Sequence, residues 1–205
     1  GPHDRVWRVP WLGPHKRPAG GTSKRRCLGI DRFGSVNIRL MDHPPAAADQ
    51  RVPLEDQLSE MVALRDQGKI AGIGISAADR AQVQLAIEQA GIVCVQNAFS
   101  LIDQTDADVL QLCHDNGLAY VPYFPLGSAF PNTPKVTDNA AARAVAERLG
   151  ASLAQVGLAW LLAHRDNILL IPGTSRVAHL EQNLAVGDLA LSADDVAELE
   201  TSGQS

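Results

Sequence analysis

The chain has 205 residues, of which 45% are apolar and 20% charged, and its formal net charge is −5. This composition is typical of a globular protein of one domain or slightly more, with enough apolar residues for a sizeable core. The sequence has no apolar run long enough for a transmembrane helix and no signal-peptide pattern at its start, so we expect a cytoplasmic location and no membrane partner.

The charge is unevenly distributed along the chain. Residues 1–30 hold seven of the 18 Lys and Arg residues but only one of the 23 Asp and Glu residues. They are rich in Pro and Gly and lack the period of a strand or a helix, so we interpret them as an irregular basic N-terminal segment. Residues 31–205 are acidic, which disfavours nucleic acid as a partner. Nucleic-acid binding by the basic segment is the weaker hypothesis, because only charge supports it.

Strands and helices are predicted to alternate through the rest of the chain. Pro53 is a favourable residue to open a helix, because its missing N–H needs no partner there. Ser152 and Gln155 form a capping-box pattern, and Ser192 opens the last helix. The predicted strands are 35–41, 70–76, 92–99, 118–126 and 168–172, and the predicted helices are 53–67, 83–90, 105–116, 139–149, 153–165, 176–184 and one from 193.

The predicted strands are continuous runs of Ile, Val and Leu, which indicates burial on both faces. Alternation of such strands with helices predicts an α/β fold with a parallel sheet and crossover helices. Because an eight-stranded barrel needs about 250 residues, about five strands indicate a smaller open sheet or part of a (β/α) barrel. In a partial barrel the strands near 36–41 and 168–171 would lack a neighbour, which predicts self-association through the sheet edges.

The cysteines do not indicate a disulfide framework or a metal site. Cys27, Cys94 and Cys113 are odd in number, and no two of them form a C-x-x-C pair. Cys94 lies in an apolar run and Cys113 on a helical face, so both are predicted to be reduced core residues. We predict no metal site.

Polar or aromatic residues follow four successive predicted strands. They are Ser76, Gln96, Tyr123 and Thr174. The carboxyl ends of parallel strands meet at one edge of an α/β fold, where ligands bind. One such residue would be an ordinary loop residue, but such residues after four successive strands favour a ligand-binding site at this edge.

The last of these positions has a further property. Gly173, Thr174 and Ser175 come directly before a predicted helix. Free amides, hydroxyl groups and the positive end of the helix dipole would converge there, which favours an anion such as a phosphate. Arg176 or His179 could add positive charge, whereas the simpler interpretation is a serine cap of the helix.

Five segments of the sequence resemble the aldo/keto reductases, and they occur in that family's order. They are "GKIAGIGIS", "VCVQNAFSLID", "LAYVPYFPLG", "LGASLAQVGLAWLLAH" and "IPGTSRVAHLEQN". The resemblance covers residues 30 to about 200. It implies a (β/α)8 TIM-barrel-type fold, present over residues 31–205 as a partial barrel that matches the second half. It also implies extended binding of NADPH and reduction of small aldehydes and ketones.

The resemblance assigns residues to the nicotinamide end of the cofactor. Ser76 matches the Ser of a Ser-Asn pair that holds the carboxamide, and Gln96 matches the Gln that completes this grip. Ala77 stands where the family has the Asn. Tyr123 matches the aromatic residue that stacks on the nicotinamide ring, as suits a flat ring.

The resemblance also assigns residues to the rest of the cofactor. Leu126 and Gly127 match a loop near the pyrophosphate. His179 stands where many members place an Arg for the 2′-phosphate, and Gln182 and Asn183 match a pair that binds the adenine. Three further residues match the segment around the 2′-phosphate: Gly173, Thr174 and Ser175.

The chain departs from the family in its catalytic residues. The family uses a Tyr as proton donor together with Lys, Asp and His, and no segment here matches the Tyr, Lys and Asp of the first strands. Arg39 aligns with the His. Two interpretations remain open: an NADPH-dependent carbonyl reductase, truncated so that this chain alone could be inactive, or a non-catalytic NADP-binding remnant or regulatory protein. A loss of the N-terminal half, with residues 1–30 in its place, would explain the truncation.

Overall fold

The computed structural model describes residues 6–8, 29–40, 52–128 and 133–203. They belong to two compact units, residues 1–96 and residues 97–205. Within the described ranges, no helix has the length and apolarity needed to cross a membrane.

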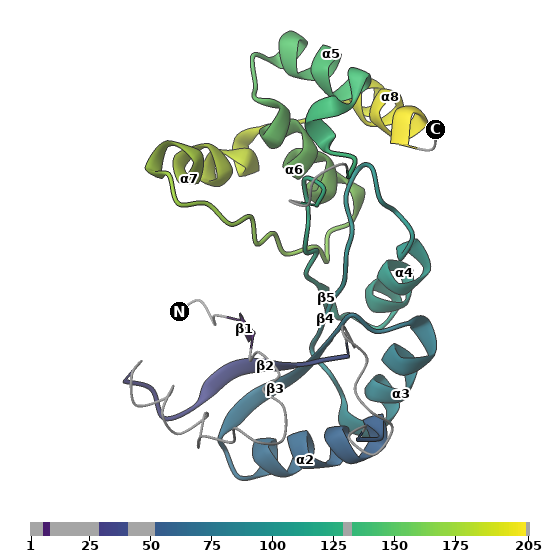
Figure 1. The fold of residues 1–205 in the computed structure, drawn as a ribbon, viewed down its shortest axis with the longest axis vertical. Helices are drawn as coiled ribbons and strands as arrows, with labels where there is room; N and C mark the ends of the chain where they lie inside the picture. Colours follow the sequence, from purple (N-terminus) through teal and green to yellow (C-terminus); the bar gives the residue numbers. More distant parts are fainter. Residues whose placement is uncertain (1–5, 9–28, 41–51, 129–132, 204–205) are drawn as a thin grey trace. The chain divides into compact units, whose positions relative to one another are not determined.

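The first unit is built on parallel strands. Its strands are β1 (Val6–Arg8), β2 (Phe33–Arg39), β3 (Ile70–Ser76) and β4 (Cys94–Gln96), which pair in that order. All three pairings are parallel (Figure 1). The parallel arrangement predicted from the apolar runs is therefore confirmed.

Two crossover helices pack against this sheet. The helices α2 (Leu54–Asp66) and α3 (Arg80–Ala90) lie side by side along β3 (Figure 1). A capping box begins α3, in which the Gln82 amide donates to Asp79 Oδ1 at 2.8 Å and the Asp79 amide donates to Gln82 Oε1 at 2.9 Å. Gly91 ends α3 in the left-handed conformation, which a residue without Cβ adopts without strain.

The strands of the first unit have an apolar face and a face of small and polar residues. Alternation along β3 places Ile73 and Ile75 on one face, and both are fully buried. Leu58 of α2 and Val83 of α3 are also fully buried and complete this apolar core. The opposite face of β3 carries Gly72, Gly74 and Ser76.

The expectation that the strand near 36–41 lacks a neighbour is wrong. β1 pairs with β2, with Val6 opposite Ser35 and Arg8 opposite Asn37. Three residues of the basic segment are therefore a strand, because their backbone groups complete the ladder along β2. Residues 1–5 and 9–28 of that segment lie outside the described residues.

In the second unit, α6 (Leu153–His164) packs against α5 (Ala140–Leu149), α7 (Val177–Leu184) and α8 (Ala193–Gly203) (Figure 1). Ser152 and Gln155 form the predicted capping box at its start, with the Gln155 amide donating to Ser152 Oγ at 3.3 Å. The unit's elements are α4 (Ala107–Asp115), β5 (Ala119–Tyr120), the 3₁₀ turn η2 (Val136–Asp138), α5 (Ala140–Leu149), α6 (Leu153–His164), α7 (Val177–Leu184), the 3₁₀ turn η3 (Ala185–Asp188) and α8 (Ala193–Gly203).

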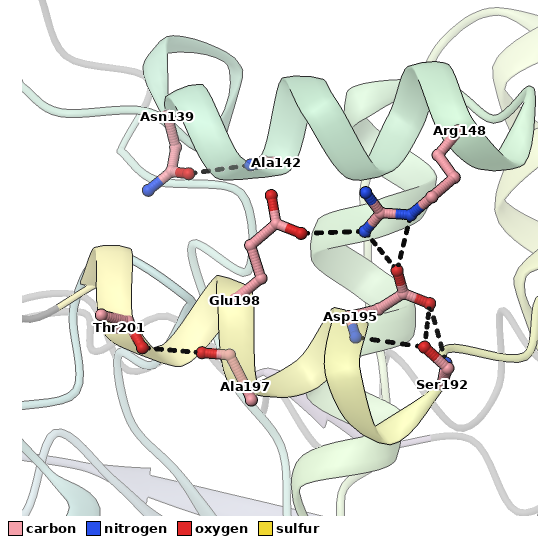
Figure 2. Close-up of polar contacts among 8 residues, drawn as sticks. All are labelled: Asn139, Ala142, Arg148, Ser192, Asp195, Ala197, Glu198 and Thr201. Carbon is pink, nitrogen blue, oxygen red and sulfur yellow. Dashed lines mark hydrogen bonds and ion pairs between the residues drawn. The ribbon is translucent and has the colours of Figure 1, made fainter.

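A polar network joins α5 to the start of α8 (Figure 2). Ser192 caps α8 as predicted: Asp195 N donates to its hydroxyl at 3.1 Å, and Ser192 N donates to Asp195 Oδ2 at 2.9 Å. The Arg148 guanidinium donates to Asp195 Oδ1 and, at 2.9 Å, to Glu198 Oε2. The Ser192 hydroxyl and the Arg148 guanidinium lower the pKa of Asp195 to about 2.

The predicted strand 168–172 is the clearest failure of the sequence pattern. Only Ile168 pairs, in a parallel bridge to Tyr120, and the Leu169 amide donates to the Tyr120 carbonyl at 2.8 Å. Residues 169–172 have no regular secondary structure, since no described strand pairs with them. The predicted strand 118–126 is likewise shorter, with two residues in β5 and a bridge between Ala98 and Tyr123.

Candidate functional site

Three of the predicted site residues lie in one row at the carboxyl ends of the strands. Arg39 at the end of β2 is opposite Ser76 of β3, and Ser76 is opposite Gln96 of β4. Ser76 and Gln96 are each 2% exposed, whereas Arg39 is exposed. The row is the predicted binding edge of the first unit, because parallel strands bring their carboxyl ends together.

The backbone fixes the strand ends to one another. The Leu40 amide donates to the Ser76 carbonyl at 2.9 Å, and the Ala77 amide donates to the Gln96 carbonyl at 3.1 Å. Ala77 has a φ of 57°, a conformation that a residue with Cβ adopts only under strain. The tight turn after β3 thus holds Ser76 beside Gln96.

Ser76 carries a buried hydroxyl group that no described residue satisfies. Its Oγ is fully shielded and has no hydrogen-bond partner among the described residues. A buried polar atom without a partner costs about 1–3 kcal/mol. A polar ligand at the strand ends could supply the missing hydrogen bond and recover that free energy.

Further polar side chains, which the sequence pattern did not single out, lie behind this row. Ser35 and Asn37 of β2 and Cys94 of β4 lie on the same face as Ser76 and Gln96, and each is buried. Cys94 is a free buried thiol, as predicted, but it takes part in hydrogen bonds. The alternation of polar residues at 35, 37 and 39 was the signal that could have revealed this face.

Tyr123 lies in the second unit at the end of a short extended segment. Its amide donates to the Asn97 carbonyl at 2.9 Å, and the Phe99 amide donates to the Tyr123 carbonyl at 3.4 Å. The ring is half-buried and packs edge-on against Phe124, with ring centroids 5.2 Å apart. The exposed part of the ring can contact a flat ligand.

Leu126 and Gly127 form a tight turn. The Val136 amide donates to the Leu126 carbonyl at 3.1 Å, and the Leu126 side chain packs over Gly157 of α6. Gly127 has a φ of 93°, and a Cβ there would lie 2.6 Å from the Pro134 carbonyl oxygen. Only glycine fits this turn.

The segment before α7 is exposed and rich in hydrogen-bonding groups. Gly173, Thr174 and Ser175 are all exposed, and Thr174 Oγ1 accepts the Arg176 amide at 3.1 Å. Ser175 is not a helix cap: Arg176 is the N-cap residue and makes no side-chain capping bond. The first turn of α7 therefore presents its amides and the positive end of its dipole to an anion.

The predicted adenine-binding residues share one face of α7. His179, Gln182 and Asn183 are spaced three and four residues apart, so their side chains lie on the same side of the helix. His179 and Gln182 are exposed and Asn183 is half-buried. The Gln155 side chain of α6 donates to the Gln182 carbonyl at 3.2 Å, which fixes α7 on α6.

The predicted site residues therefore occur as three groups. Arg39, Ser76 and Gln96 form a group in the first unit. The second unit holds the groups 123–127 and 173–183. Within each group the structure places the predicted residues next to one another.

Tyr120 is a core residue of the second unit. It is fully buried, its hydroxyl donates to the Ala98 carbonyl at 3.4 Å, and burial raises the pKa of its phenol. Its ring packs edge-on against Phe99, which stacks on Trp160 of α6. In the described part of the chain, no group of His, Cys, Asp and Glu could hold a metal ion.

Comparisons of the sequence with known proteins agree with the resemblance. The chain is 37% identical over 200 residues to pyridoxine 4-dehydrogenase of Escherichia coli (strain K12), and the alignment covers 96% of this chain and 66% of that protein. It is 35% identical over 158 residues to an uncharacterized oxidoreductase, C215.11c, of Schizosaccharomyces pombe, with coverages of 77% and 50%. The chain thus spans half to two thirds of these relatives, and the first alignment includes most of residues 1–30.

Solved structures give the same result for the fold. The thermostable aldo-keto reductase Tm1743, crystallised with the inhibitor epalrestat, matches with a TM-score of 0.76 and 29% identity over 89% of this chain and 64% of that one. An aldo/keto reductase of Klebsiella pneumoniae, crystallised with NADP and acetate, matches with a TM-score of 0.79 and 25% identity. The match covers 97% of this chain and 69% of that one. The parallel strands and crossover helices are those of a partial (β/α)8 TIM barrel. Since the family model for the aldo/keto reductases also matches residues 40–203, the chain belongs to the aldo/keto reductase family.

Proposed function

We propose that the chain binds NADPH and forms the cofactor-binding part of an NADPH-dependent oxidoreductase that reduces small carbonyl compounds. The observation that carries this proposal is the buried, unsatisfied hydroxyl of Ser76 beside the buried amide of Gln96. Two findings support it: the Klebsiella neighbour was crystallised with NADP, and the Escherichia coli relative is named a dehydrogenase.

The residues at the strand ends fit the nicotinamide carboxamide. That group has a carbonyl oxygen that accepts and an amide nitrogen that donates, and the hydroxyl of Ser76 with the amide of Gln96 can pair with both. Tyr123, in the second unit, is assigned to the nicotinamide ring by the resemblance alone. Ala77 offers no side-chain hydrogen bond, so these residues should bind the carboxamide less tightly than the Ser-Asn pair that the family has.

The segment before α7 fits the phosphorylated ribose. The Thr174 and Ser175 hydroxyls and the first amides of α7 suit a dianionic 2′-phosphate. His179 is one turn into the helix, with Gln182 and Asn183 available to the adenine. These residues favour NADPH over NADH, because only NADPH carries the 2′-phosphate.

Bound NADPH would supply the hydride for carbonyl reduction. The exposed guanidinium of Arg39 at the end of β2 can donate hydrogen bonds to a carbonyl oxygen and orient it. A positioned general acid contributes typically about 10²–10⁴-fold to such a step, and Tyr120 does not fill that role. The alternative is a non-catalytic NADP-binding remnant or regulatory protein that keeps the cofactor-binding residues.

We further propose a cytoplasmic location and self-association of the chain. The first rests on composition alone. Self-association is supported by the exposed apolar residues of 169–184.

Calorimetric titration with NADPH and with NADH tests the proposal. We expect tighter binding of NADPH, and we expect Ser76→Ala to weaken it about tenfold, the effect of one lost hydrogen bond of about 1.4 kcal/mol. Ser100→Ala is the matched control, because Ser100 is also buried with an unsatisfied hydroxyl but is not at the predicted edge. The Ser100→Ala variant should bind NADPH with the affinity of the wild type.

Activity separates the two alternatives. If the chain consumes NADPH in the presence of an aldehyde, measured as the loss of the absorbance of the reduced nicotinamide, it is a reductase. Binding without consumption would establish the non-catalytic alternative. If the wild-type chain binds neither NADPH nor NADH, both alternatives are wrong.

A further inference from the structure

A line of buried polar side chains crosses the sheet of the first unit behind the strand ends. It consists of Ser35 and Asn37 on β2 and Cys94 and Gln96 on β4, and none of them is more than 6% exposed. Asn37 is opposite Gly74 of β3, which in turn is opposite Cys94. The line therefore joins two strands that are not neighbours.

Gly74 makes this connection possible. A Cβ at position 74 would lie 2.0 Å from Asn37 Oδ1 and 2.6 Å from Cys94 Sγ. The Asn37 side chain thus lies directly over the backbone of β3 and reaches the side chains of β4. A larger residue at position 74 would displace it.

The hydrogen bonds along the line run in one direction. Burial raises the pKa of the Cys94 thiol, which therefore stays protonated, and its Sγ donates to Asn37 Oδ1 at 3.4 Å. With its oxygen engaged, Asn37 donates through Nδ2 to Gln96 Oε1 at 3.3 Å. Ser35 Oγ lies 3.9 Å from Cys94 Sγ and completes the line.

We propose that Asn37 is a positioning residue for Gln96: it holds the side-chain carbonyl of Gln96, so that the N–H groups of Gln96 are directed to the carbonyl oxygen of the cofactor's carboxamide. This inference rests on the proposed function, because it takes the nicotinamide carboxamide as the ligand. Ser76, with its unsatisfied hydroxyl, then contacts the amide nitrogen of the same group. The group that Ser76 and Gln96 recognise together is thus a primary carboxamide.

Two ligands and a double-mutant cycle test the proposal. NADPH carries the nicotinamide, whereas 2′,5′-ADP carries the adenine and the 2′-phosphate without it. We expect Asn37→Leu to weaken NADPH binding about tenfold, because it removes the hydrogen bond to Gln96 Oε1, and to leave 2′,5′-ADP binding unchanged. In a Gln96→Leu background, Asn37→Leu should have no further effect, because the pair acts as one unit.

The thiol gives a milder test with matched controls. Cys94→Ser keeps a donor to Asn37 and should retain the affinity for NADPH, whereas Cys94→Ala removes it and should weaken binding. Cys113→Ala, at a buried free thiol of the second unit, should have no effect. Without any ligand, the side-chain amide NMR signal of Gln96, assigned by its loss in Gln96→Leu, should shift in Asn37→Leu.

Several results would overturn the proposal. These are an equal loss of 2′,5′-ADP binding in Asn37→Leu, a full effect of Asn37→Leu in the Gln96→Leu background, or an unshifted Gln96 signal. If Asn37→Leu does not fold, the Cys94→Ser and Cys94→Ala pair decides. If the wild-type chain binds neither ligand, the proposed function fails, and the Gln96 signal alone then decides whether Asn37 positions this side chain.

Discussion

Ala77 combines backbone strain with a missing side-chain contact. Its φ is 57°, and among the described residues other than glycine only Phe124, at 55°, also has a positive φ. Ala77→Gly should relieve the strain and raise the free energy of unfolding by up to about 1 kcal/mol. Ala77→Asn should also relieve it, because Asn tolerates this conformation, and should strengthen NADPH binding by adding a side-chain amide at the strand ends. Thermal unfolding and calorimetry measure the two effects separately.

The neighbouring residue provides the control for this prediction. Ala78 is 3% exposed and does not have a positive φ. Ala78→Gly should therefore lower the thermal midpoint, because it adds backbone freedom to the unfolded chain and removes a buried methyl group. Equal effects of glycine at positions 77 and 78 would show that Ala77 is not strained.

At the scale of elements, the start of α8 should make stability depend on pH. The pKa of Asp195 is about 2 in the folded chain, against about 3.9 for an unperturbed Asp. A lowered folded-state pKa stabilises the fold above the unfolded value, so this contribution is complete above about pH 4 and is lost as the pH falls towards 2. Asp195→Asn should cost about 1 kcal/mol at neutral pH, as for a lost helix cap, and flatten the stability profile across that window.

Asp194→Asn is the matched control, since Asp194 lies in the same helical turn and is exposed. Its unfolding free energy, from denaturant titrations at a series of pH values, should fall with acid as steeply as that of the wild type. A profile of Asp195→Asn parallel to the wild type would contradict the role given to the Arg148 and Ser192 contacts (Figure 2).

Elements that depend on local chemistry were predictable from the sequence. Ser152 and Ser192 start helices because a hydroxyl followed by Gln or Asp three residues later caps them whatever packs around the helix. The strand 168–172 was not predictable in the same way, because a strand also needs a partner. Residues 6–8 show the converse: they have no strand pattern, yet pairing with β2 makes them a strand.

The candidate site shows the same division. Ser76 and Gln96 could be predicted because each ends an apolar strand. The contact between Asn37 and Gln96 could not, because it depends on strand register and on the absence of a side chain at Gly74. A period of two places Asn37 on a face of its strand but does not tell which residue lies two strands away.

At the scale of the whole molecule, the apolar side chains that the chain leaves exposed should govern its behaviour in solution. Leu180 and Leu184 of α7 are 49% and 74% exposed, and they lie on the face opposite His179 and Gln182. Leu169 and Ile171, in the segment that does not form a strand, are 52% and 44% exposed. An apolar helix face together with exposed apolar side chains in an irregular segment of the same unit favours association of copies of the chain.

We expect the wild-type chain to form dimers or larger species, with an average mass that rises with concentration in light scattering. Leu180→Glu with Leu184→Glu should shift it towards the monomer, because charged side chains on that face would have to be buried unpaired in the associated form. Leu162→Glu is the control: this leucine of α6 is 38% exposed but lies outside 169–184, and its substitution should leave the mass distribution unchanged. A wild-type chain that stays monomeric at every concentration would show that these residues need no partner, and self-association would have to be abandoned.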